Sequence, residues 1–315
     1  MKLITNLRGK TRVYERKSDH VIVSGPAFSG KTSISNSIEL ALFGRLRDFA
    51  GRDASKEFKD VRLLKSLCPS DEHLNVILHA LQSEYQWKLN GRSGEHTITG
   101  PNPLVYDVIG EGLKLFGARD PLLYWARFIQ DEALNELLKL ESKLRKVKKQ
   151  VNAYKDATEV GTLTNYHQVA YEAGKEQWRD LSSQVLASKE DLKTRVRRKL
   201  IDLNDQLKSK SICGIQCSID DQTGAVAIRG PHITARGVDQ SIAPSGTEAL
   251  IITLLIGSIC SSTLAPIRAA LLPDRSIDTE TLEQIHIFMC QEFDLSCIQS
   301  STTWIDSEHS IILKR

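Results

Sequence analysis

The octapeptide GPAFSGKT at residues 25–32 constrains the fold of this chain more than any other segment. It fits the pattern G-x-x-x-x-G-K-[ST], in which two glycines and a lysine stand at fixed spacing. A β-branched run, HVIVSG, leads into it from residue 20, and the apolar helical pattern SISNSIELALFG follows from residue 33. The segment therefore predicts a strand, a loop and a helix in succession, which is the building unit of an α/β fold.

The residue types of this loop indicate a phosphate site for a nucleotide. Glycine allows backbone N–H groups to turn toward phosphate oxygens, while Lys31 reaches the β- and γ-phosphates and Thr32 offers a hydroxyl to Mg²⁺. The positive end of the following helix points at the same phosphates. A surface Gly/Ser loop is the alternative, and the flanking strand and helix disfavour it. We expect ATP and Mg²⁺ as ligands, with contacts from Gly25, Ser29, Gly30, Lys31, Thr32 and Ser33.

The chain is predicted to have three parts. Residues 1–130 form an N-terminal α/β lobe, with strands around the turn Asn90-Gly91. Residues 131–210 form an antiparallel coiled-coil hairpin, because apolar residues recur on one face on each side of the break TEVGTLTN. Residues 211–315 form a C-terminal α/β lobe. The seam residues are Leu137, Leu140, Leu144, Val147, Val151 and Tyr154, then Leu181, Val185, Leu192, Val196, Leu200, Leu203 and Leu207. An ordinary bundle core is the alternative, and the heavily charged outer faces favour the hairpin.

The C-terminal lobe has clear local patterns. A β-hairpin is predicted at residues 212–230, around the turn DDQTG. A buried helix is predicted at 245–260 and an amphipathic helix at 279–293. Closing strands are predicted at 295–302 and 309–315. Strands and helices therefore alternate here as they do in the N-terminal lobe.

The order of the motifs resembles a known family. The phosphate loop comes first, then ARFIQDEALNELL leads into the coiled coil, and APSGTEALIITLL lies in the second lobe. This order resembles the ABC-type ATPase heads of the SMC and double-strand-break-repair kind, above all the bacterial SbcC group and its phage relatives. The resemblance implies a P-loop ATPase head built from both lobes, with the coiled-coil hairpin inserted between them.

The resemblance assigns roles to further residues. Gln130, on the strand entering the coil, takes the place of the Q-loop glutamine that binds Mg²⁺ and water. Ser245, Gly246 and Glu248 match the signature motif, which caps the γ-phosphate held by another subunit, and this implies an ATP-sandwich homodimer. Taken alone, Gln130 is an ordinary solvated residue, and SGTE is an ordinary helix N-cap with a carboxylate in the first turn.

The sequence departs from the family at the acidic motif. Asp278 suits the D-loop, but Leu271 stands seven positions before it, where the family has an acidic residue. Asp274 is the best remaining carboxylate on the Mg²⁺ side, Arg275 stands where a catalytic glutamate is expected, and Glu280 is a weak substitute base. We therefore expect ATP hydrolysis, with Lys31, Gln130 and Asp274 as the catalytic residues, to be slow. The switch histidine and the zinc-hook cysteines of the family are also missing.

Charge is segregated along the chain, although the net charge is only +3. Residues 139–155 carry net +6 and residues 189–210 carry net +4, which leaves −7 for the rest. A surface that follows a DNA backbone has this pattern, and a solvated coil face is the alternative. DNA is therefore a predicted partner, and an SbcD-type nuclease is a second one implied by the resemblance.

Three other readings of the function stay open. The first alternative is a nucleotide-gated clamp or scaffold with little hydrolysis. The second is an ABC-like ATPase of an anti-phage or mobile-element system, and the third is a small-molecule P-loop kinase. The kinase does not explain the coil or PSGTEAL. No apolar run reaches the length of about 18 residues that a membrane helix needs, since the longest, ALIITLLIGSIC, has 12. With no signal-peptide pattern and six scattered cysteines without a CxxC pair, we expect a reduced protein of the cytoplasm or nucleoid.

Overall fold

The structure is a computed structural model, and its described residues form two compact units. The first unit comprises Met1–Ala118, Asp205–Ser218 and Val226–Arg315, and the second comprises Arg119–Asn204 and Ile219–Ala225. The residues that the structure describes are 1–7, 11–27, 29–46, 73–101, 105–109, 120–129, 131–159, 165–230, 233–236, 246–259, 267–272, 277–301 and 309–313.

A five-stranded parallel sheet is the centre of the first unit. Its strand order is β13–β3–β12–β11–β7, and every neighbouring pair is parallel. Parallel strands are buried on both faces, and all six residues of β12 are buried although Ser296, Gln299 and Ser300 are polar. The strands are β3 (His20–Ser24), β7 (Val105–Asp107), β11 (Ile267–Leu272), β12 (Leu295–Ser300) and β13 (Ser310–Ile312).

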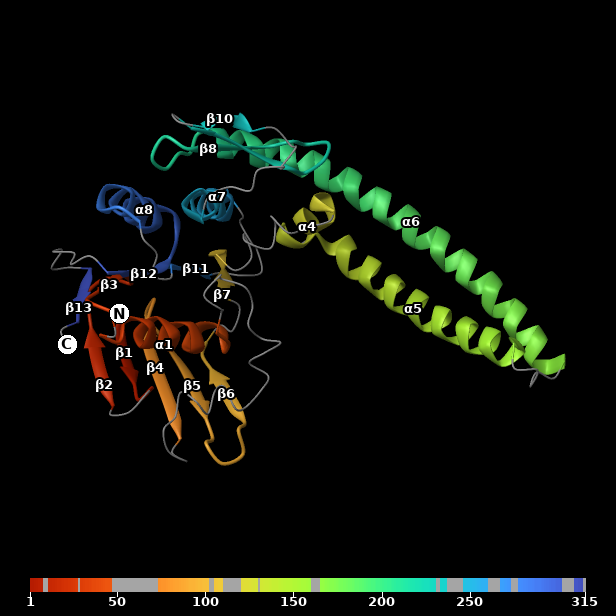
Figure 1. Ribbon diagram of the computed structural model, residues 1–315, viewed down its shortest axis with the longest axis horizontal. Helices are drawn as coiled ribbons and strands as arrows, with labels where there is room; N and C mark the ends of the chain where they lie inside the picture. The colour runs from red at the N-terminus through yellow and green to blue at the C-terminus, as the bar shows by residue number, and fades with distance from the viewer. Residues whose placement is uncertain are drawn as a thin grey trace. The chain divides into compact units, whose positions relative to one another are not determined.

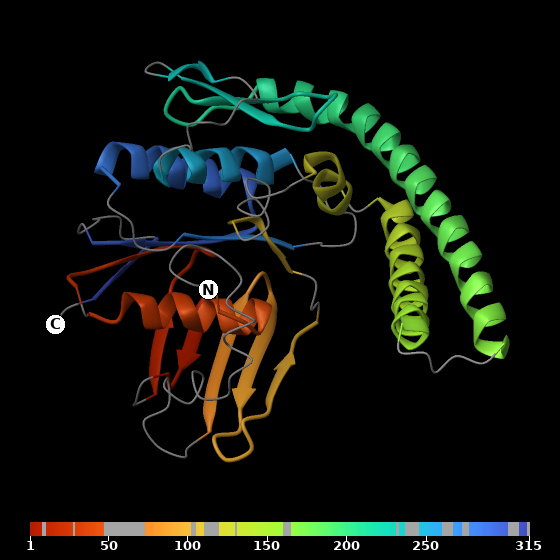
Figure 2. The same cartoon turned by 45° about the vertical axis from the view of Figure 1, so that its right-hand side comes forward.

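Helices cover both faces of the parallel sheet. Helix α1 (Lys31–Phe43) lies on one face, and α7 (Gly246–Ile259) and α8 (Thr279–Glu292) lie on the other (Figure 2). In α7 the residues from Leu250 to Ile259 are all buried, as the sequence predicted for this helix. The arrangement places the amino end of α1 directly after the loop that follows β3.

A second, antiparallel sheet packs against the other side of α1 (Figure 1). Its order is β2–β1–β4–β5–β6. The predicted turn at Asn90-Gly91 is found between β5 and β6, but the sequence missed a second turn at Leu81 and Gln82. Both of these residues have positive φ, at 53° and 58°, without being glycine. The strands are β1 (Lys2–Thr5), β2 (Arg12–Glu15), β4 (Leu74–Ala80), β5 (Ser83–Leu89) and β6 (His96–Thr99).

A small third sheet has the order β10–β9–β8. Its strands are β8 (Gln216–Ile219), β9 (Val226–Gly230) and β10 (Ile233–Arg236), so the predicted strands of residues 212–230 are present. Asp220 accepts hydrogen bonds from the backbone N–H groups of Gln222 and Thr223, at 2.9 and 2.8 Å, and so closes the turn between β8 and β9.

The second unit is mainly helical. It contains α4 (Pro121–Phe128), α5 (Glu132–Glu159) and most of α6 (Asn165–Lys208). Helices α5 and α6 run antiparallel, since Glu141 pairs with Lys189 while Val151 lies against Gly174 farther along. The residues buried on them are seam residues: Leu137, Val147, Val185, Leu192, Val196, Leu200 and Leu207.

The strand predicted to enter the coil at Gln130 is wrong. Residues 121–128 are the helix α4, because Asp120 caps it through the Leu123 N–H, Pro121 suits its first turn, and Trp125 is buried on one face. The strand beside β11 in the parallel sheet is β7. Within the described ranges, no helix has both the length and the apolar character to cross a membrane.

Candidate functional site

The candidate site lies at the carboxyl edge of the parallel sheet. Ser24, the last residue of β3, pairs with Ser300 of β12 and with Ile312 of β13, so the ends of these three strands meet at one level. Ligands of open α/β sheets bind outside the carboxyl ends of the strands. The loop at residues 25–30 begins at this level and leads directly into α1.

Two glycines give this loop its shape. Gly25 has φ 155°, and a Cβ atom there would come within 2.8 Å of both the Leu313 carbonyl oxygen and Ser29 Oγ. Gly30 has φ 102° and immediately precedes α1. No side chain at this position accepts a hydrogen bond from the first backbone N–H groups of the helix. This geometry matches what a phosphate cradle requires at these two positions.

The Lys31 side chain is folded into the loop. Its ammonium group donates to the Gly25 carbonyl oxygen at 2.7 Å and to the Pro26 carbonyl oxygen at 3.2 Å, and the residue is only 5% exposed. The hydroxyl groups of Ser24 and Ser29 are buried, and neither has a hydrogen-bond partner among the described residues. A buried cation beside unsatisfied hydroxyls fits a polar, anionic ligand such as a phosphate group.

Thr32 is placed next to a residue that the sequence analysis missed. Its hydroxyl donates to Gln299 Oε1 at 3.5 Å, and Gln299 is 6% exposed near the end of β12. Amide and hydroxyl oxygens are the ligand type that Mg²⁺ and its bound water prefer. The only signal in the sequence is that Gln299 is the one large polar residue of the strand LSCIQS.

Arg12 is a second residue that the sequence analysis missed. Its Nη1 atom lies 3.7 Å from where a Cβ on Gly30 would stand, although Arg12 belongs to β2 of the antiparallel sheet. Arg12 is exposed, and its side chain forms no ion pair with another described residue. A second cation is therefore available at the amino end of α1. No local pattern in the sequence distinguishes this arginine.

The other predicted site residues are only partly described. Ser33 lies in the first turn of α1, and its N–H donates to the Gly30 carbonyl oxygen at 3.0 Å. Gly246 is the first residue of α7, with Glu248 partly buried in its first turn. Gln130, Ser245 and Asp274, as well as Arg275, lie outside the described residues.

Asp278, the D-loop candidate, has a local role in the structure. Its side chain accepts the Thr281 N–H at 2.8 Å and so caps α8. This hydrogen bond, with others from the same turn, lowers the pKa of the Asp278 carboxyl. The carboxylate is therefore held ionised at the helix end.

The fold is similar to those of several solved structures, although the sequence matches no known family. No protein-family model matches the chain, and no curated protein sequence matches it either. The RecF–ATP structure, from a recombination mediator of the RecFOR pathway, is similar over 99% of this chain and 94% of its own, with TM-score 0.53 and 11% identity. An Smc head bound to the C-terminal winged-helix domain of ScpA is similar over 100% and 94%, with TM-score 0.52 and 9% identity.

A third similar structure is the Smc head with an extended coiled coil from Pyrococcus furiosus, bound to the C-terminal domain of ScpA. It covers 96% of this chain and 89% of its own, with TM-score 0.47 and 14% identity. At such low identity the likeness to RecF and the Smc head is one of fold. The chain shares its α/β fold with RecF and the Smc head, the kind of fold predicted from the sequence.

Proposed function

We propose that this chain binds ATP with Mg²⁺ and acts as an SMC- or SbcC-like ATPase head in DNA processing, repair or recombination. The observation that carries the proposal is the buried Lys31 ammonium inside a loop whose shape depends on Gly25 and Gly30. The loop stands at the carboxyl edge of a parallel sheet, where such a ligand is expected. The fold shared with RecF and Smc heads supports the role in DNA maintenance.

Different residues of the site are proposed to bind the phosphates and the Mg²⁺ ion. On ATP binding, Lys31 exchanges the two carbonyl oxygens for the β- and γ-phosphates, while the amino end of α1 faces the same oxygens. Thr32, Gln299 and Asp274 are the side chains proposed to hold Mg²⁺, which would neutralise the phosphate charge. Arg12 adds a second cation from the neighbouring sheet.

Calorimetric titration with Mg²⁺·ATP tests the nucleotide site. Lys31→Ala should weaken binding by about 10- to 150-fold, because a charge-assisted hydrogen bond contributes about 1.5–3 kcal/mol. Lys88→Ala, which removes an exposed lysine of β5, is the matched control and should leave the affinity unchanged. Equal affinities for the Lys31 variant and the natural chain would contradict the assignment.

ATP is proposed to join two copies of the chain. Gly246 is the first residue of α7 and Ser245 precedes it in the sequence, so a hydroxyl and a positive helix end are proposed to cap a phosphate bound to the other copy. Light scattering with a non-hydrolysable analogue and Mg²⁺ should give a dimer for the natural chain and a monomer for Ser245→Arg. A natural chain that stays monomeric at saturating analogue would rule out the sandwich.

Turnover is proposed to be slow, with Asp274 and Gln130 orienting the metal and water. An arginine at position 275 cannot accept a proton from the attacking water, and loss of a general base costs about 10²–10⁴-fold in rate. Asp274→Asn should lower phosphate release further while ATP binding persists. A fast rate that survives Asp274→Asn would refute this placement of the acidic motif. Slow turnover with tight ATP binding would favour the second candidate, a nucleotide-gated clamp.

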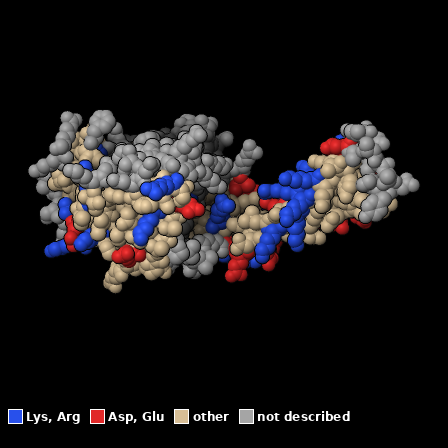
Figure 3. All heavy atoms as spheres, turned by 90° about the horizontal axis from the view of Figure 1, so that it is seen from below, with Lys and Arg blue, Asp and Glu red and all other residues tan. Residues whose placement is uncertain are grey.

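DNA is proposed to bind along α5 and α6. In Figure 3, Lys and Arg side chains form a band over this part of the molecule. Lys146, Lys148 and Lys149 are exposed on α5, and none has an ion-pair partner recorded among the described residues. On the neighbouring surface, by contrast, Arg195 and Lys199 are already paired with Asp131. Lys146, Lys148 and Lys149 are therefore the side chains proposed to contact the DNA phosphates.

Salt titration of DNA binding, with ATP present, tests this surface. Replacing Lys146, Lys148 and Lys149 together by Gln should reduce the slope of log K against log[salt] by about 3, since each phosphate contact contributes about 0.9. Replacing Lys2, Lys17 and Lys88 together is the matched control for net charge. Binding with an unchanged slope would leave α5 as a solvated coil face.

A protein partner is also proposed. The two Smc head structures are complexes with parts of ScpA, and RecF is named within the RecFOR pathway. For this chain the proposed partner is an SbcD-type nuclease, or the effector of an anti-phage or mobile-element system. Co-purification of the full chain with the products of neighbouring genes would discriminate between these two.

A further inference from the structure

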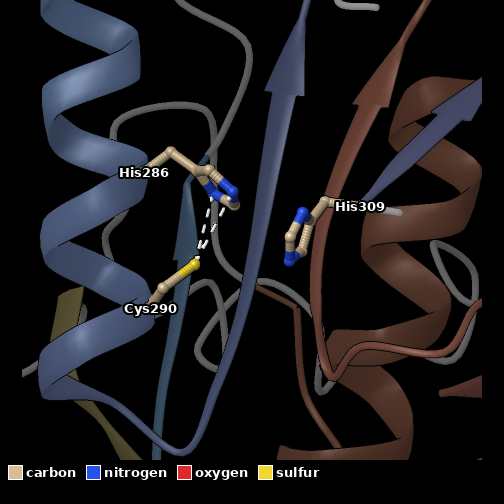
Figure 4. A group of neighbouring side chains, drawn as sticks. All are labelled: His286, Cys290 and His309. Carbon is tan, nitrogen blue, oxygen red and sulfur yellow. Dashed lines mark hydrogen bonds between the residues drawn. The ribbon is translucent and has the colours of Figure 1, made fainter. Parts of the chain in front are cut away.

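A cluster of two histidines and a cysteine lies on the α8 side of the parallel sheet, apart from the nucleotide loop. His286 and Cys290 are one turn apart on α8, and His309 precedes β13 (Figure 4). One ligand atom from each residue lies within 4.8 Å of the other two, and it is the one such group found among the described residues. None of the three enters the proposed ATP chemistry.

The distances within the cluster are those of a metal site. Cys290 Sγ lies 3.6 Å from His286 Nε2 and 3.8 Å from His286 Nδ1. A tetrahedral Zn²⁺ with Zn–S of about 2.3 Å and Zn–N of about 2.0–2.1 Å places sulfur and nitrogen about 3.6 Å apart. The His286 and His309 rings have centroids 5.2 Å apart and meet edge-on, at 72°. The ligand atoms of the three residues all lie within 4.8 Å of one another, so one ion can be reached by all three side chains.

The surroundings also favour a bound cation. His286 is only 6% exposed, whereas Cys290 and His309 are partly exposed, so an ion can enter from solvent on one side. Thiolate and imidazole together select Zn²⁺ and similar soft ions over Mg²⁺ or Ca²⁺.

We propose that His286, Cys290 and His309 bind one Zn²⁺-like divalent cation, with a fourth position left for water. The site would tie α8 to the segment that leads into β13. The His309 carbonyl oxygen accepts the Ile22 N–H at 2.9 Å, and the Leu313 N–H donates to the Ser24 carbonyl oxygen at 2.9 Å. The ion would thus brace β13 against the strand that carries the nucleotide loop.

Titration of the reduced, metal-free full chain with Co²⁺ tests the site. We expect one Co²⁺ per chain, with the thiolate charge-transfer absorption and the tetrahedral ligand-field bands of a His₂Cys site. Cys290→Ser should abolish the charge-transfer band, and His309→Asn should weaken binding by more than about 100-fold, since even outer-shell losses cost 10–100-fold. Cys213→Ser, at a cysteine outside the cluster, is the control and should leave the spectrum unchanged.

Thermal unfolding distinguishes a built site from loose binding. Zn²⁺ should raise the melting temperature of the natural chain and of Cys213→Ser, but not that of Cys290→Ser or His309→Asn. Absent thiolate absorption, or absorption that survives Cys290→Ser, would overturn the proposal. ATP affinity measured in parallel keeps this result separate from the nucleotide site.

Discussion

The two compact units are stabilised in different ways. In the first, all six residues of β12 are buried and helices cover the parallel sheet on both faces. In the second, α5 and α6 bury only a narrow seam, and ion pairs such as Glu141–Lys189 cross beside it at 2.8 Å. A two-sided core fixes the positions of the groups at its edge, whereas a seam with charged flanks leaves most of its surface for binding. Variants should therefore disturb one unit without the other.

Trp125→Ala should give the largest effect, within the second unit. Trp125 is fully buried, packs edge-on against Phe128 at 5.4 Å, and donates through Nε1 to the Gly224 carbonyl oxygen at 2.7 Å. Its removal should cost about 3–5 kcal/mol of the free energy of unfolding. Denaturant unfolding followed by circular dichroism measures this, and Trp178→Ala, at a 37% exposed position, is the control. A retained ATP affinity would show that the units are independent.

Gly257→Ala should disturb the first unit by a smaller amount. A Cβ at Gly257 would stand 2.1 Å from Cγ1 of Val108, which is fully buried. Overpacking costs about 1–3 kcal/mol, and the better helix propensity of alanine returns at most about 1 kcal/mol. We expect a net loss of about 1–2 kcal/mol in the denaturant experiment. The double variant with Val108→Ala should recover stability relative to Val108→Ala alone, and a strictly additive result would argue against the clash.

Asp131→Asn should weaken the second unit in a pH-dependent way. Burial opposes ionisation of Asp131, but hydrogen bonds from Lys199 and the Ala133 N–H outweigh it and lower the pKa. The stabilisation is therefore present above the unfolded pKa of about 3.9 and is lost as the pH falls through the lower folded value. Because Lys199 and Arg195 are about half exposed, we expect about 1–2 kcal/mol at neutral pH.

The control for this experiment is Asp202→Asn, an exposed residue of α6. Unfolding curves at neutral pH and at a pH below the lowered folded pKa of Asp131 should differ between Asp131→Asn and the natural chain only at neutral pH. A difference that persists in acid would mean that packing of the side chain, and not its charge, stabilises this unit.

Arg12→Ala should give the smallest effect, on ATP affinity alone. The guanidinium lies beside Gly30 but is exposed, so its contribution is screened by solvent and is at most about 1 kcal/mol, or fivefold. Calorimetry at low and high salt should reveal a loss that shrinks as salt rises. Arg92→Ala, at an exposed position after β5, is the control. A loss as large as that of Lys31→Ala would mean that Arg12 is a principal ligand of the phosphates.

The predictions that succeeded depend on local patterns. The strand–loop–helix at residues 20–43, the buried helix α7 and the seam residues of α5 and α6 each occupy one continuous stretch. The strand expected at Gln130 was wrong because the apolar run before it also suits a helix, and the Asp120 cap and Pro121 decide for the helix. Short apolar runs do not distinguish the two structures by themselves.

The sequence by itself determined the strand–loop–helix at residues 20–43, the alternation of strands and helices, and the long helices α5 and α6, because each is encoded by neighbours along the chain. Only the tertiary structure brought Arg12 beside Gly30, Gln299 beside Thr32, and His309 beside Cys290. These pairs are separated by many residues and meet through the order in which strands assemble into sheets. The sheet order is decided by the burial of both faces together, which no single segment specifies.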